Sequence, residues 1–507
     1  MRKLRFLCLA AALLLAFSGC MRAQAADTDA YVMAGYDNTQ YRKWSGNQFF
    51  ARMEEWTGVR FEYRQYTNLE EWEKEKASMK ADGELPDVLF KAMLTTEECI
   101  RLRDAGVLID LKPYLNEENA PNLWAILQSD PELIHAITLP DGSIAALPFI
   151  NSLPKQNCIW INTAWLKSLN LQAPTNAAEM KAVLSAFLER DPNKNGRADE
   201  IPLSFQGPFD LKFLAHAYGL IANDYNIFAQ DGKVRFMPLE ENYRDFVAWC
   251  RDLYESRLLD KNGFVQQSRT VTDSNATRRY GMIITPEITD VYRTEWALKE
   301  YGIMLPLEYN GERVYRDFSG PLLRGTFAVT CACKDPEEMI RWVDRLYSEE
   351  GAVLANVGKE NEDYVFDGDG TWRLTEAAAQ NSSYYSALTL ITGGATAPGT
   401  LATEFEKKYG GEGDLVKVLS EQEAFNAYTR MPFPYYSLTE EQAQRIAPLQ
   451  NAIGFYVDEQ LARWVLGEDE ISDESFEAFE KRLKELGLEE FLSFWQDVLD
   501  ENRGGKE

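Results

Sequence analysis

The chain has 507 residues, of which 45% are hydrophobic and 12% aromatic, and its formal net charge at pH 7 is -27. This length predicts about two or three domains, and the strongly acidic charge disfavours nucleic acid and anionic lipid as partners, because both repel it. The only histidines are His135 and His216, which leaves almost no material for a histidine-based metal site or a Ser-His-Asp triad.

The N-terminal segment resembles a bacterial lipoprotein signal that ends on a cysteine. Arg2, Lys3 and Arg5 precede an apolar run at 6–17, and Cys20 follows closely. The run is too short to span a membrane, which takes ~20 apolar residues in a helix. We therefore expect a signal peptide at 1–19, lipidation of Cys20, a tether at 20–29 and a location on the outer face of the cytoplasmic membrane. A secretory signal cut at 23–25 is the alternative and would release the protein.

Short apolar strands alternate with amphipathic helices from residue 30 onward. Strands are predicted at 30–36, 59–63, 86–90 and 144–150, and helices at 47–57 and about 69–82. Gly58 marks the end of the first helix. Short apolar strands separated by helices predict an α/β fold, with parallel strand pairing and helices on both faces of each sheet.

The alternation begins again after residue 150. Strands are predicted at 157–161, 201–205, 280–285 and 327–332, and helical segments at 175–188, 208–259, 287–301 and 336–348. Helices dominate beyond residue 401, with predicted helices at 440–466, 473–487 and 488–502. Two α/β units without a linker predict two lobes joined by several chain crossings.

The cysteines favour core packing over chemistry. Five remain after Cys20, an odd number without a C-x-x-C pair, which disfavours a disulfide framework. Cys331 and Cys333 lie two residues apart in an apolar, strand-like run, so we expect both to be buried on one side of a strand.

Several segments together resemble the extracellular solute-binding proteins of ABC importers, in particular the large sugar-binding lipoproteins of Gram-positive bacteria. The resemblance covers nearly all of the chain after residue 30 and depends on the order and spacing of its motifs. These are E-E-W-T-G-V at 54–59, L-P-D-V-L-F at 85–90, D-A-G-V-L-I-D-L-K-P-Y at 104–114, A-P-N at 120–122, L-P-D-G at 139–142 with L-P at 147–148, I-N-T-A-W-L-K-S-L-N-L at 161–171 with P-T at 174–175, and G-L-E-E-F-L at 487–492.

The resemblance implies a two-lobed fold of the type II periplasmic-binding-protein class, in which two sheets flanked by helices close on a ligand like a hinge. We expect lobe 1 to comprise 30–150 and about 275–326, and lobe 2 to comprise 151–274 and about 327–400. The helical region 401–507 is expected to pack on the lobes.

The segment Asp191–Glu200 resembles the first half of an EF-hand calcium loop. Asp191, Asn193 and Asn195 offer side-chain oxygens, Gly196 permits the turn and Arg197 offers its backbone carbonyl. A proline stands where the bidentate glutamate would be, so Asp199 and Glu200 must close the site. Related solute-binding proteins carry a similar loop, which implies a structural Ca²⁺ here. The alternative is an Asx-rich surface turn, and a tight turn is also expected at 367–370.

Ligands of α/β proteins lie beyond the carboxyl ends of strands, and this rule nominates the residues of a sugar site. Aromatic rings would cover the apolar faces of a saccharide, and polar side chains would bond its hydroxyl groups. Tryptophans in helical patterns, such as Trp495, are expected in the core. The ligand candidates are Tyr36, Asp37, Trp44, Lys91, Asn151, Trp160, Gln206, Phe209, Thr285 and Glu287.

The resemblance implies a monomeric binding protein, without catalysis, that passes a carbohydrate, in particular an oligosaccharide, to ABC permease subunits. A peptide or lipid ligand is the alternative within this class. A lipid-anchored glycoside hydrolase is a second hypothesis and requires two carboxylates across a cleft, although the sequence contains no nucleophile elbow or metal triad. A surface glycan-capture protein built mainly from helices is a third, and the strand–helix alternation up to residue 350 argues against it.

Overall fold

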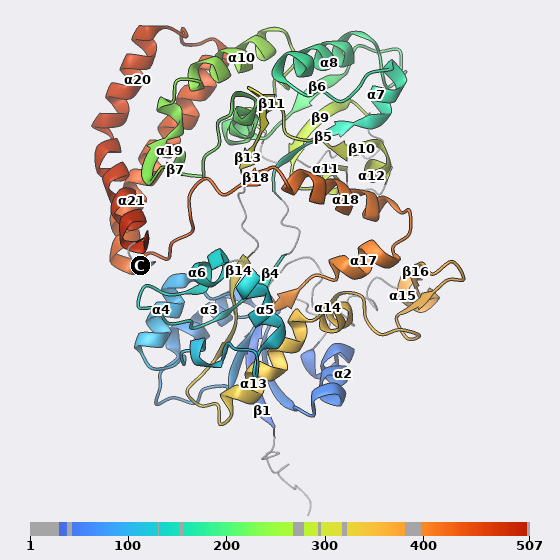
Figure 1. The fold of residues 1–507 in the computed structure, drawn as a ribbon, viewed down its shortest axis with the longest axis vertical. Helices are drawn as coiled ribbons and strands as arrows, with labels where there is room; N and C mark the ends of the chain where they lie inside the picture. Colours follow the sequence, from blue (N-terminus) through green and yellow to red (C-terminus); the bar gives the residue numbers. More distant parts are fainter. Residues whose placement is uncertain are drawn as a thin grey trace, which may run out of the picture.

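The computed structural model describes residues 30–37, 43–129, 131–151, 156–266, 278–292, 296–316, 322–380 and 397–503. Within these residues the chain forms two α/β lobes, and its last helices lie along one side of the molecule (Figure 1). The two-lobed α/β fold predicted from the sequence is thus confirmed. The expected signal peptide, Cys20 and the tether lie outside the described residues.

Lobe 1 is built on a sheet with the described strand order β17-β4-β14-β3-β1-β2. Strand β14 runs antiparallel to its neighbours, whereas the other strands are parallel to one another. The parallel strands therefore end at the same edge of the sheet. Their bounds are β1 Tyr31–Tyr36, β2 Phe61–Tyr66, β3 Val88–Phe90, β4 Leu147–Ile150, β14 Leu322–Val329 and β17 Gly399–Thr400.

Lobe 2 contains a smaller sheet, described with the order β10-β5-β9-β6. Strand β5 is antiparallel to β9 and β10, and β6 is parallel to β9. The start of β5 therefore meets the ends of β6 and β9 at one edge. The bounds are β5 Cys158–Asn162, β6 Ile201–Ser204, β9 Tyr280–Thr285 and β10 Tyr301–Ile303.

The sheet topology corrects two of the expected lobe assignments. Strand β9, expected in lobe 1, pairs with β5 and β6 of lobe 2. Strand β14, whose predicted core at 327–332 was expected in lobe 2, lies between β3 and β4 of lobe 1. Both are short apolar strands, and periodicity alone does not indicate which sheet such a strand joins. The chain consequently changes lobe between β4 and β5, again between β10 and β14, and once more after β17.

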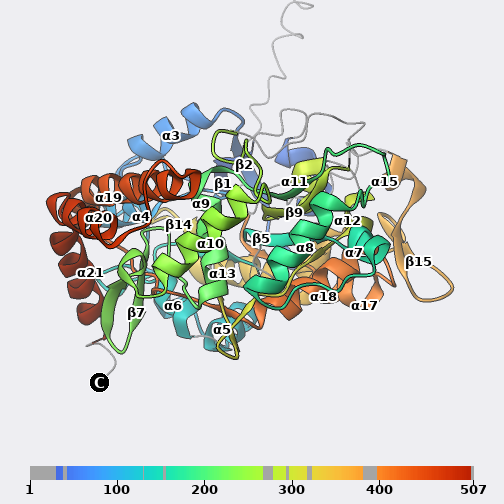
Figure 2. The same ribbon diagram turned by 90° about the horizontal axis from the view of Figure 1, so that it is seen from above.

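Helices cover both sheets, and the last ones pack mainly on lobe 2 (Figures 1 and 2). Lobe 1 carries α2 Gln48–Thr57, α3 Leu69–Ser78, α4 Thr96–Asp104, α5 Pro121–Ser129, α6 Pro131–Ile137, α13 Pro336–Asp344, α14 Glu349–Asn356, α15 Glu376–Gln380 and α17 Thr403–Tyr409. Lobe 2 carries α7 Thr163–Leu169, α8 Ala177–Glu189, α9 Gly207–Leu211, α10 Tyr243–Glu255, α11 Ile288–Tyr292, α12 Trp296–Glu300 and α18 Asp414–Asn426. The C-terminal helices are α19 Glu440–Leu466, α20 Asp473–Glu485 and α21 Leu488–Arg503.

Local capping explains why the longest predicted helix is correct at both ends. The Thr439 side chain accepts a hydrogen bond from the backbone of Gln442, whose side chain bonds back to Thr439, so α19 begins with a capping box. Gly467 ends the helix at φ 78°, a left-handed conformation that glycine adopts without strain.

The prediction that helical segments fill 208–259 is wrong in the middle of this range. Strands β7 Ile227–Gln230 and β8 Lys233–Phe236 form an antiparallel hairpin there. Asp231 and Gly232 both have positive φ, at 51° and 79°, as a two-residue type I′ turn requires. The Asp-Gly pair was thus a hairpin signal within a segment of helical composition. Short hairpins at β11–β12 (Glu308–Tyr309, Glu312–Arg313) and β15–β16 (Tyr364–Phe366, Trp372–Leu374) were also missed.

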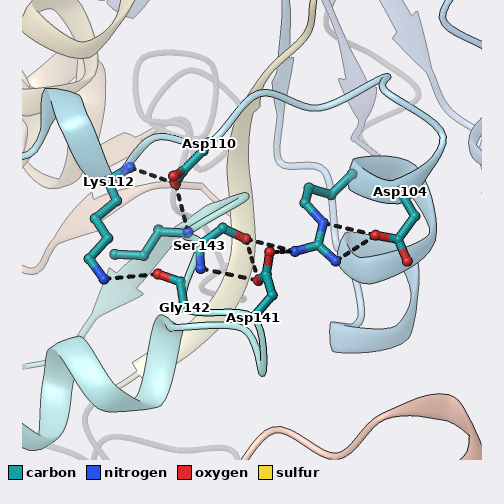
Figure 3. A network of polar contacts seen from close by, with 8 residues as sticks. Asp104, Asp110, Lys112, Asp141, Gly142 and Ser143 are labelled. Atoms are coloured by element: carbon teal, nitrogen blue, oxygen red, sulfur yellow. Dashed lines mark hydrogen bonds and ion pairs between the residues drawn. The ribbon is translucent and has the colours of Figure 1, made fainter.

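Two of the family-like motifs form a polar turn network in lobe 1 (Figure 3). Asp110 accepts hydrogen bonds from the backbone N–H groups of Lys112 and Ile144, at 3.0 and 2.9 Å. The Lys112 ammonium donates to the Gly142 carbonyl at 2.9 Å, and Asp141 pairs with Arg103. These motif residues therefore hold two loops together and are structural.

The cysteine expectation is half right. Cys99, Cys158 and Cys250 are buried, and the five described cysteines are all free thiols. Cys331 is exposed, because β14 ends at Val329 and the chain turns outward before it reaches this residue.

None of the described helices has both the length and the apolar character needed to cross a membrane.

Candidate functional site

In lobe 1 the candidates that follow the parallel strands meet at one edge, as expected. The Lys91 ammonium, after β3, lies 2.8 Å from a carboxylate oxygen of Asp37, after β1. Both side chains are mostly buried, and the same oxygen accepts a hydrogen bond from the Trp44 indole at 3.2 Å. Asn151 is half-buried at the end of β4 on this edge, and Tyr36 is half-buried at the end of β1. The positive charge of Lys91 is thus neutralised within the protein.

Trp44 does not have the exposed face that a stacking residue needs. Its ring is 1% exposed and packs against Phe50, Tyr63 and Phe90, with ring centroids 5.7–6.2 Å apart. The expectation of direct sugar contact is therefore wrong for this structure. The 3₁₀ turn at 44–46 places the residue under the sheet edge, where it orients Asp37.

In lobe 2 the candidates divide into buried and accessible residues. Trp160 is 2% exposed and donates its indole N–H to the backbone carbonyl of Thr285, which is itself fully buried. Neither can contact a ligand here, because both lie on strands packed inside the core. Gln206, Phe209 and Glu287 are half-buried and stay candidates.

Phe209 belongs to a cationic cluster that the sequence did not single out. The Arg316 guanidinium lies 5.8 Å from the Phe209 ring centroid and 4.7 Å from that of Phe213. Arg316 also bonds Asp224 at 2.8 Å. Lys212 lies 5.0 Å from the Phe209 centroid and pairs with Asp458 at 2.9 Å. Burial lowers the pKa of Lys212, and Asp458 partly offsets the effect.

Beside this cluster lies a cavity of about 180 Å³, which we name the aromatic pocket. Tyr225 and Trp495 stack at its wall, with ring centroids 5.7 Å apart and planes 20° apart. Tyr225 is 40% exposed and Tyr435 43% exposed, so both residues are accessible from solvent. Its lining consists of Asn223, Asp224, Tyr225, Arg316, Met431, Pro432, Phe433, Pro434, Tyr435, Tyr436, Leu438 and Trp495.

The extended segment 431–438 of this pocket also contacts lobe 1. The Arg324 guanidinium, on β14, lies 4.0 Å from the Tyr435 ring centroid. His135, on α6, makes an edge-to-face contact with Tyr436 at 5.1 Å. Figure 1 shows this orange stretch running from β18 (Thr429–Arg430) to α19, between the upper and lower lobes. The pocket therefore lies where the two lobes approach one another.

The loop Asp191–Glu200 has the features that a calcium ion would need. The Asp191 carboxylate accepts hydrogen bonds from the backbone N–H groups of Asn195 and Gly196, both at 3.1 Å. Glu200 is 7% exposed, and one of its carboxylate oxygens is buried without a hydrogen-bond partner. Burial raises the pKa of Glu200, and the nearby charges of Asp191 and Asp199 raise it further. A cation among these carboxylates would reverse that shift.

Amide and backbone oxygens are essential to this site. Among the described residues no three His, Cys, Asp or Glu side chains form a metal-holding group by themselves. Asn193 and Asn195 would therefore have to contribute, together with the backbone carbonyl of Arg197. Oxygen donors of this mixed kind are the ones Ca²⁺ takes in protein loops. The residues present thus fit calcium, with the unpaired Glu200 oxygen as the main indication.

Comparisons with known proteins agree on one class. No protein-family model matches the sequence. The fructooligosaccharide ABC transporter substrate-binding protein FusA of Streptococcus pneumoniae is 27% identical over 493 residues, which cover 90% of this chain and 87% of that protein. The structure of FusA with kestose has a TM-score of 0.67 at 24% identity and covers 94% of this chain and all of FusA.

Two further structures extend the likeness. An EF-hand mutant of FusA in complex with fructo-nystose has a TM-score of 0.66 at 24% identity and covers 94% of this chain and 99% of that one. An extracellular solute-binding protein from Bifidobacterium longum subsp. infantis has a TM-score of 0.72 at 19% identity, with coverages of 93% and 98%. The chain is a homologue of the substrate-binding proteins of ABC transporters.

The sequence-based candidates did not include the residues that line the aromatic pocket. Arg316, Tyr225 and the aromatic segment 431–438 were not candidates, and Trp495 was assigned to the core. Trp495 is indeed only 5% exposed, yet it is one of the residues that line the pocket. The signal that could have found the segment is M-P-F-P-Y-Y at 431–436, where two prolines prevent helix and leave aromatic rings in an extended stretch.

We expect Arg324→Ala to weaken ligand binding about fivefold, because a cation–π contact of ~1 kcal/mol holds Tyr435 in the pocket wall. Arg324→Lys should restore part of the loss. Arg345→Ala removes a comparable contact, 5.1 Å from Trp56 and outside the pocket, and serves as the matched control. Calorimetric dissociation constants test this, and equal affinity in Arg324→Ala and wild-type protein would contradict the positioning role.

Proposed function

We propose that this protein captures a neutral oligosaccharide between its lobes and delivers it, unaltered, to the permease of an ABC importer. The observation that carries the proposal is the FusA likeness along nearly the whole chain, together with an aromatic pocket at the meeting of the lobes. The relative is named for fructooligosaccharides, and these are the first ligands to test.

The electrostatics of the facing edges favour an uncharged ligand. Lys91 pairs with Asp37, Lys212 with Asp458 and Arg316 with Asp224, at 2.8, 2.9 and 2.8 Å. Each of these three cations is thus neutralised by a carboxylate of the protein. A polyuronate would need surplus positive charge to offset the acidic surface, whereas hydroxyl groups need only polar partners and ring faces.

The volume of the aromatic pocket suits one end of an oligosaccharide. A cavity of about 180 Å³ is smaller than the ~300–1,000 Å³ of typical ligand sites, so it would hold one end of a longer ligand. The half-buried Gln206, Phe209 and Glu287, with Tyr36 and Asn151 on the opposite lobe, are proposed to contact the rest.

Titration calorimetry with kestose tests the function, with digalacturonate as an anionic control. We expect a dissociation constant on the order of micromolar for the neutral sugar, equivalent to about -8 kcal/mol. Digalacturonate should bind at least tenfold more weakly. Tighter binding of the uronate would contradict the electrostatic argument, and no binding of any neutral oligosaccharide across a panel would contradict the function.

The proposal also includes export, a lipid anchor at Cys20 and action as a monomer without catalysis. The relatives are named as binding proteins, and one from Bacillus subtilis, 24% identical over 315 residues, is named lipoprotein LipO. The glycoside hydrolase hypothesis has no positive support in the described site. The mainly helical alternative is wrong, because sheets form the centre of both lobes.

A structural calcium ion at 191–200 is part of the same proposal. It is supported by the unpaired Glu200 oxygen and by the existence of an EF-hand in FusA, of which a mutant structure is known. The loop precedes β6, whose carboxyl end carries Gln206. Its role would be to fix the start of that strand.

A further inference from the structure

The four residues that follow β3 form a loop with an unusual backbone, and we name residues 91–94 the β3 loop. Lys91 and Met93 both have φ 51°, in the left-handed region that residues other than glycine rarely adopt. Such conformations persist where the surrounding structure enforces them, and they concentrate at ligand sites. The contacts of the β3 loop therefore bear on function as well as on packing.

Strand β14 fixes one side of the β3 loop. The Ala92 N–H donates to the Thr326 carbonyl at 3.1 Å, and the Leu94 N–H donates to the Gly325 carbonyl at 3.0 Å. A Cβ atom at Gly325 would lie 2.0 Å from the Leu94 carbonyl oxygen, so only glycine permits this close approach. The loop is thus bound tightly along the start of β14.

Helix α3 fixes the other side of the β3 loop with two buried donors. The Trp72 indole donates to the Ala92 carbonyl at 2.8 Å, and the Lys76 ammonium donates to the Met93 carbonyl at 3.2 Å. Trp72 is fully buried, and Lys76 is 1% exposed and pairs with Glu98 at 2.9 Å. The left-handed conformation is therefore enforced by the protein itself, before any ligand binds.

The two strained residues differ in what their side chains do. The Lys91 ammonium is mostly buried and bonds Asp37. The Met93 side chain is 37% exposed and lies outside the hydrophobic clusters of the described residues. Glycine would adopt φ 51° without strain, so neither the backbone nor the core explains a methionine at this position.

The β3 loop lies at the edge of lobe 1 that faces lobe 2. Figure 1 shows β1 beginning at the far end of lobe 1, and the parallel strand β4 ends at Ile150 where the chain continues into lobe 2. Leu94 bonds Gly325, whose neighbour Arg324 contacts Tyr435 of the aromatic pocket at 4.0 Å. The loop is therefore close in the fold to the wall of that pocket.

We propose that Met93 is a ligand-contacting residue of lobe 1, whose thioether chain packs against the apolar C–H face of a sugar ring, and that Lys76 is the positioning residue that holds it there. This rests on the proposed function, because it assigns a further part of the same interlobe site. A methionine chain is apolar and adaptable, so it suits C–H faces whose tilt differs between linkages. Because the loop is already ordered, the contact costs little entropy when the ligand binds.

Met93→Gly tests the contact, because it removes the side chain and the backbone strain together. Arg257→Gly is the matched control, since Arg257 is exposed, has φ 61° and lies after α10, outside the aromatic pocket. Both variants should keep or raise the melting temperature. Met93→Gly alone should weaken binding of kestose by about fivefold or more. Met93→Leu, of similar volume, should stay within about twofold of wild-type protein.

Calorimetry with kestose, or with the tightest-binding neutral sugar of the panel, provides the measurement. Equal affinity of Met93→Gly and wild-type protein would overturn the contact, and so would an equal loss of affinity in Arg257→Gly. A melting temperature of Met93→Gly well below that of Arg257→Gly would make Met93 a packing residue and overturn the proposal. Absence of sugar binding by wild-type protein would instead refute the proposed function, so the two failures are distinguishable.

Lys76→Met tests the positioning role, because it removes the ammonium and keeps an unbranched side chain. We expect affinity to fall about threefold in the wild-type background and to stay unchanged in the Met93→Gly background, where no side chain is left to position. Equal losses in both backgrounds, or no loss in either, would overturn the role of Lys76. Trp72→Phe removes only the N–H that holds Ala92 and tests the same coupling if Lys76→Met does not fold.

Discussion

Calcium is expected to raise the melting temperature of the chelator-treated protein by roughly 5 °C. At a calcium concentration 100 times the dissociation constant, binding to the folded state alone contributes about 2.7 kcal/mol, and such a gain shifts the transition of a domain of this size by several degrees. The physical reason is the repulsion among Asp191, Asp199 and the buried Glu200, which the ion would remove.

The variant Glu200→Gln is expected to change stability in opposite directions without and with calcium, relative to wild-type protein. In the absence of calcium the charged Glu200 is destabilising, because its pKa is raised in the folded state. Stability therefore falls as pH rises from the unfolded-state pKa through the raised folded-state pKa. The glutamine variant should be slightly more stable than wild type in chelator above this range, and should gain much less from calcium. Calcium affinity of the wild type should rise with pH over the same window.

Differential scanning calorimetry with and without chelator measures both effects. Asp367→Asn with Asp369→Asn changes the other acidic, glycine-rich turn of the chain, where the side chains bond Arg373 and Thr371, and serves as the control. It should keep the full calcium response. An equal calcium shift in Glu200→Gln and wild-type protein would refute the site.

Removing the Tyr225 ring is expected to weaken oligosaccharide binding at least tenfold. Tyr225 stacks on Trp495, lines the pocket and is 40% exposed, so Tyr225→Ala should cost little stability. An aromatic face against a sugar contributes ~1–2 kcal/mol, and 1.4 kcal/mol corresponds to a factor of ten in affinity. Calorimetry with kestose provides the measurement.

Two further variants separate ring stacking from other causes. Tyr225→Phe should keep most of the affinity, because it removes only the hydroxyl group. Phe455→Ala removes a ring that is 73% exposed on α19 and lies outside the pocket, so its affinity should equal that of wild-type protein. Wild-type affinity in Tyr225→Ala would exclude this pocket from the ligand site.

The sequence predicted much of the fold because local signals agreed with the final structure. Strand β1 had the apolar character of a buried strand. Helices α2 and α19 had helical spacing of their apolar residues and cap residues at their ends, so both signals predicted helix. The partnership of strands was different, because β9 and β14 are both short and apolar. Long-range strand pairing decides which sheet each of them joins, and a short window of sequence does not contain that information.

The site was predictable where it depended on strand ends and unpredictable where it depended on packing. Asp37 and Lys91 meet because parallel strands end together. Trp44 and Trp160 also follow this rule in sequence, yet their side chains turn inward. Arg316 and the segment 431–438 come from a crossing and from a connection between helices, so only the folded chain brings them to Tyr225.

The interleaving of the two sheets has a consequence for biogenesis. Lobe 1 takes its outermost strand, β17, from residues 399–400, and α21 at the end of the chain packs against β8 of lobe 2. Neither half is therefore complete until nearly the whole polypeptide has been synthesised, and such late, distant pairing is slow. If the protein is exported as we propose, this order of events would help to postpone native structure until translocation has finished.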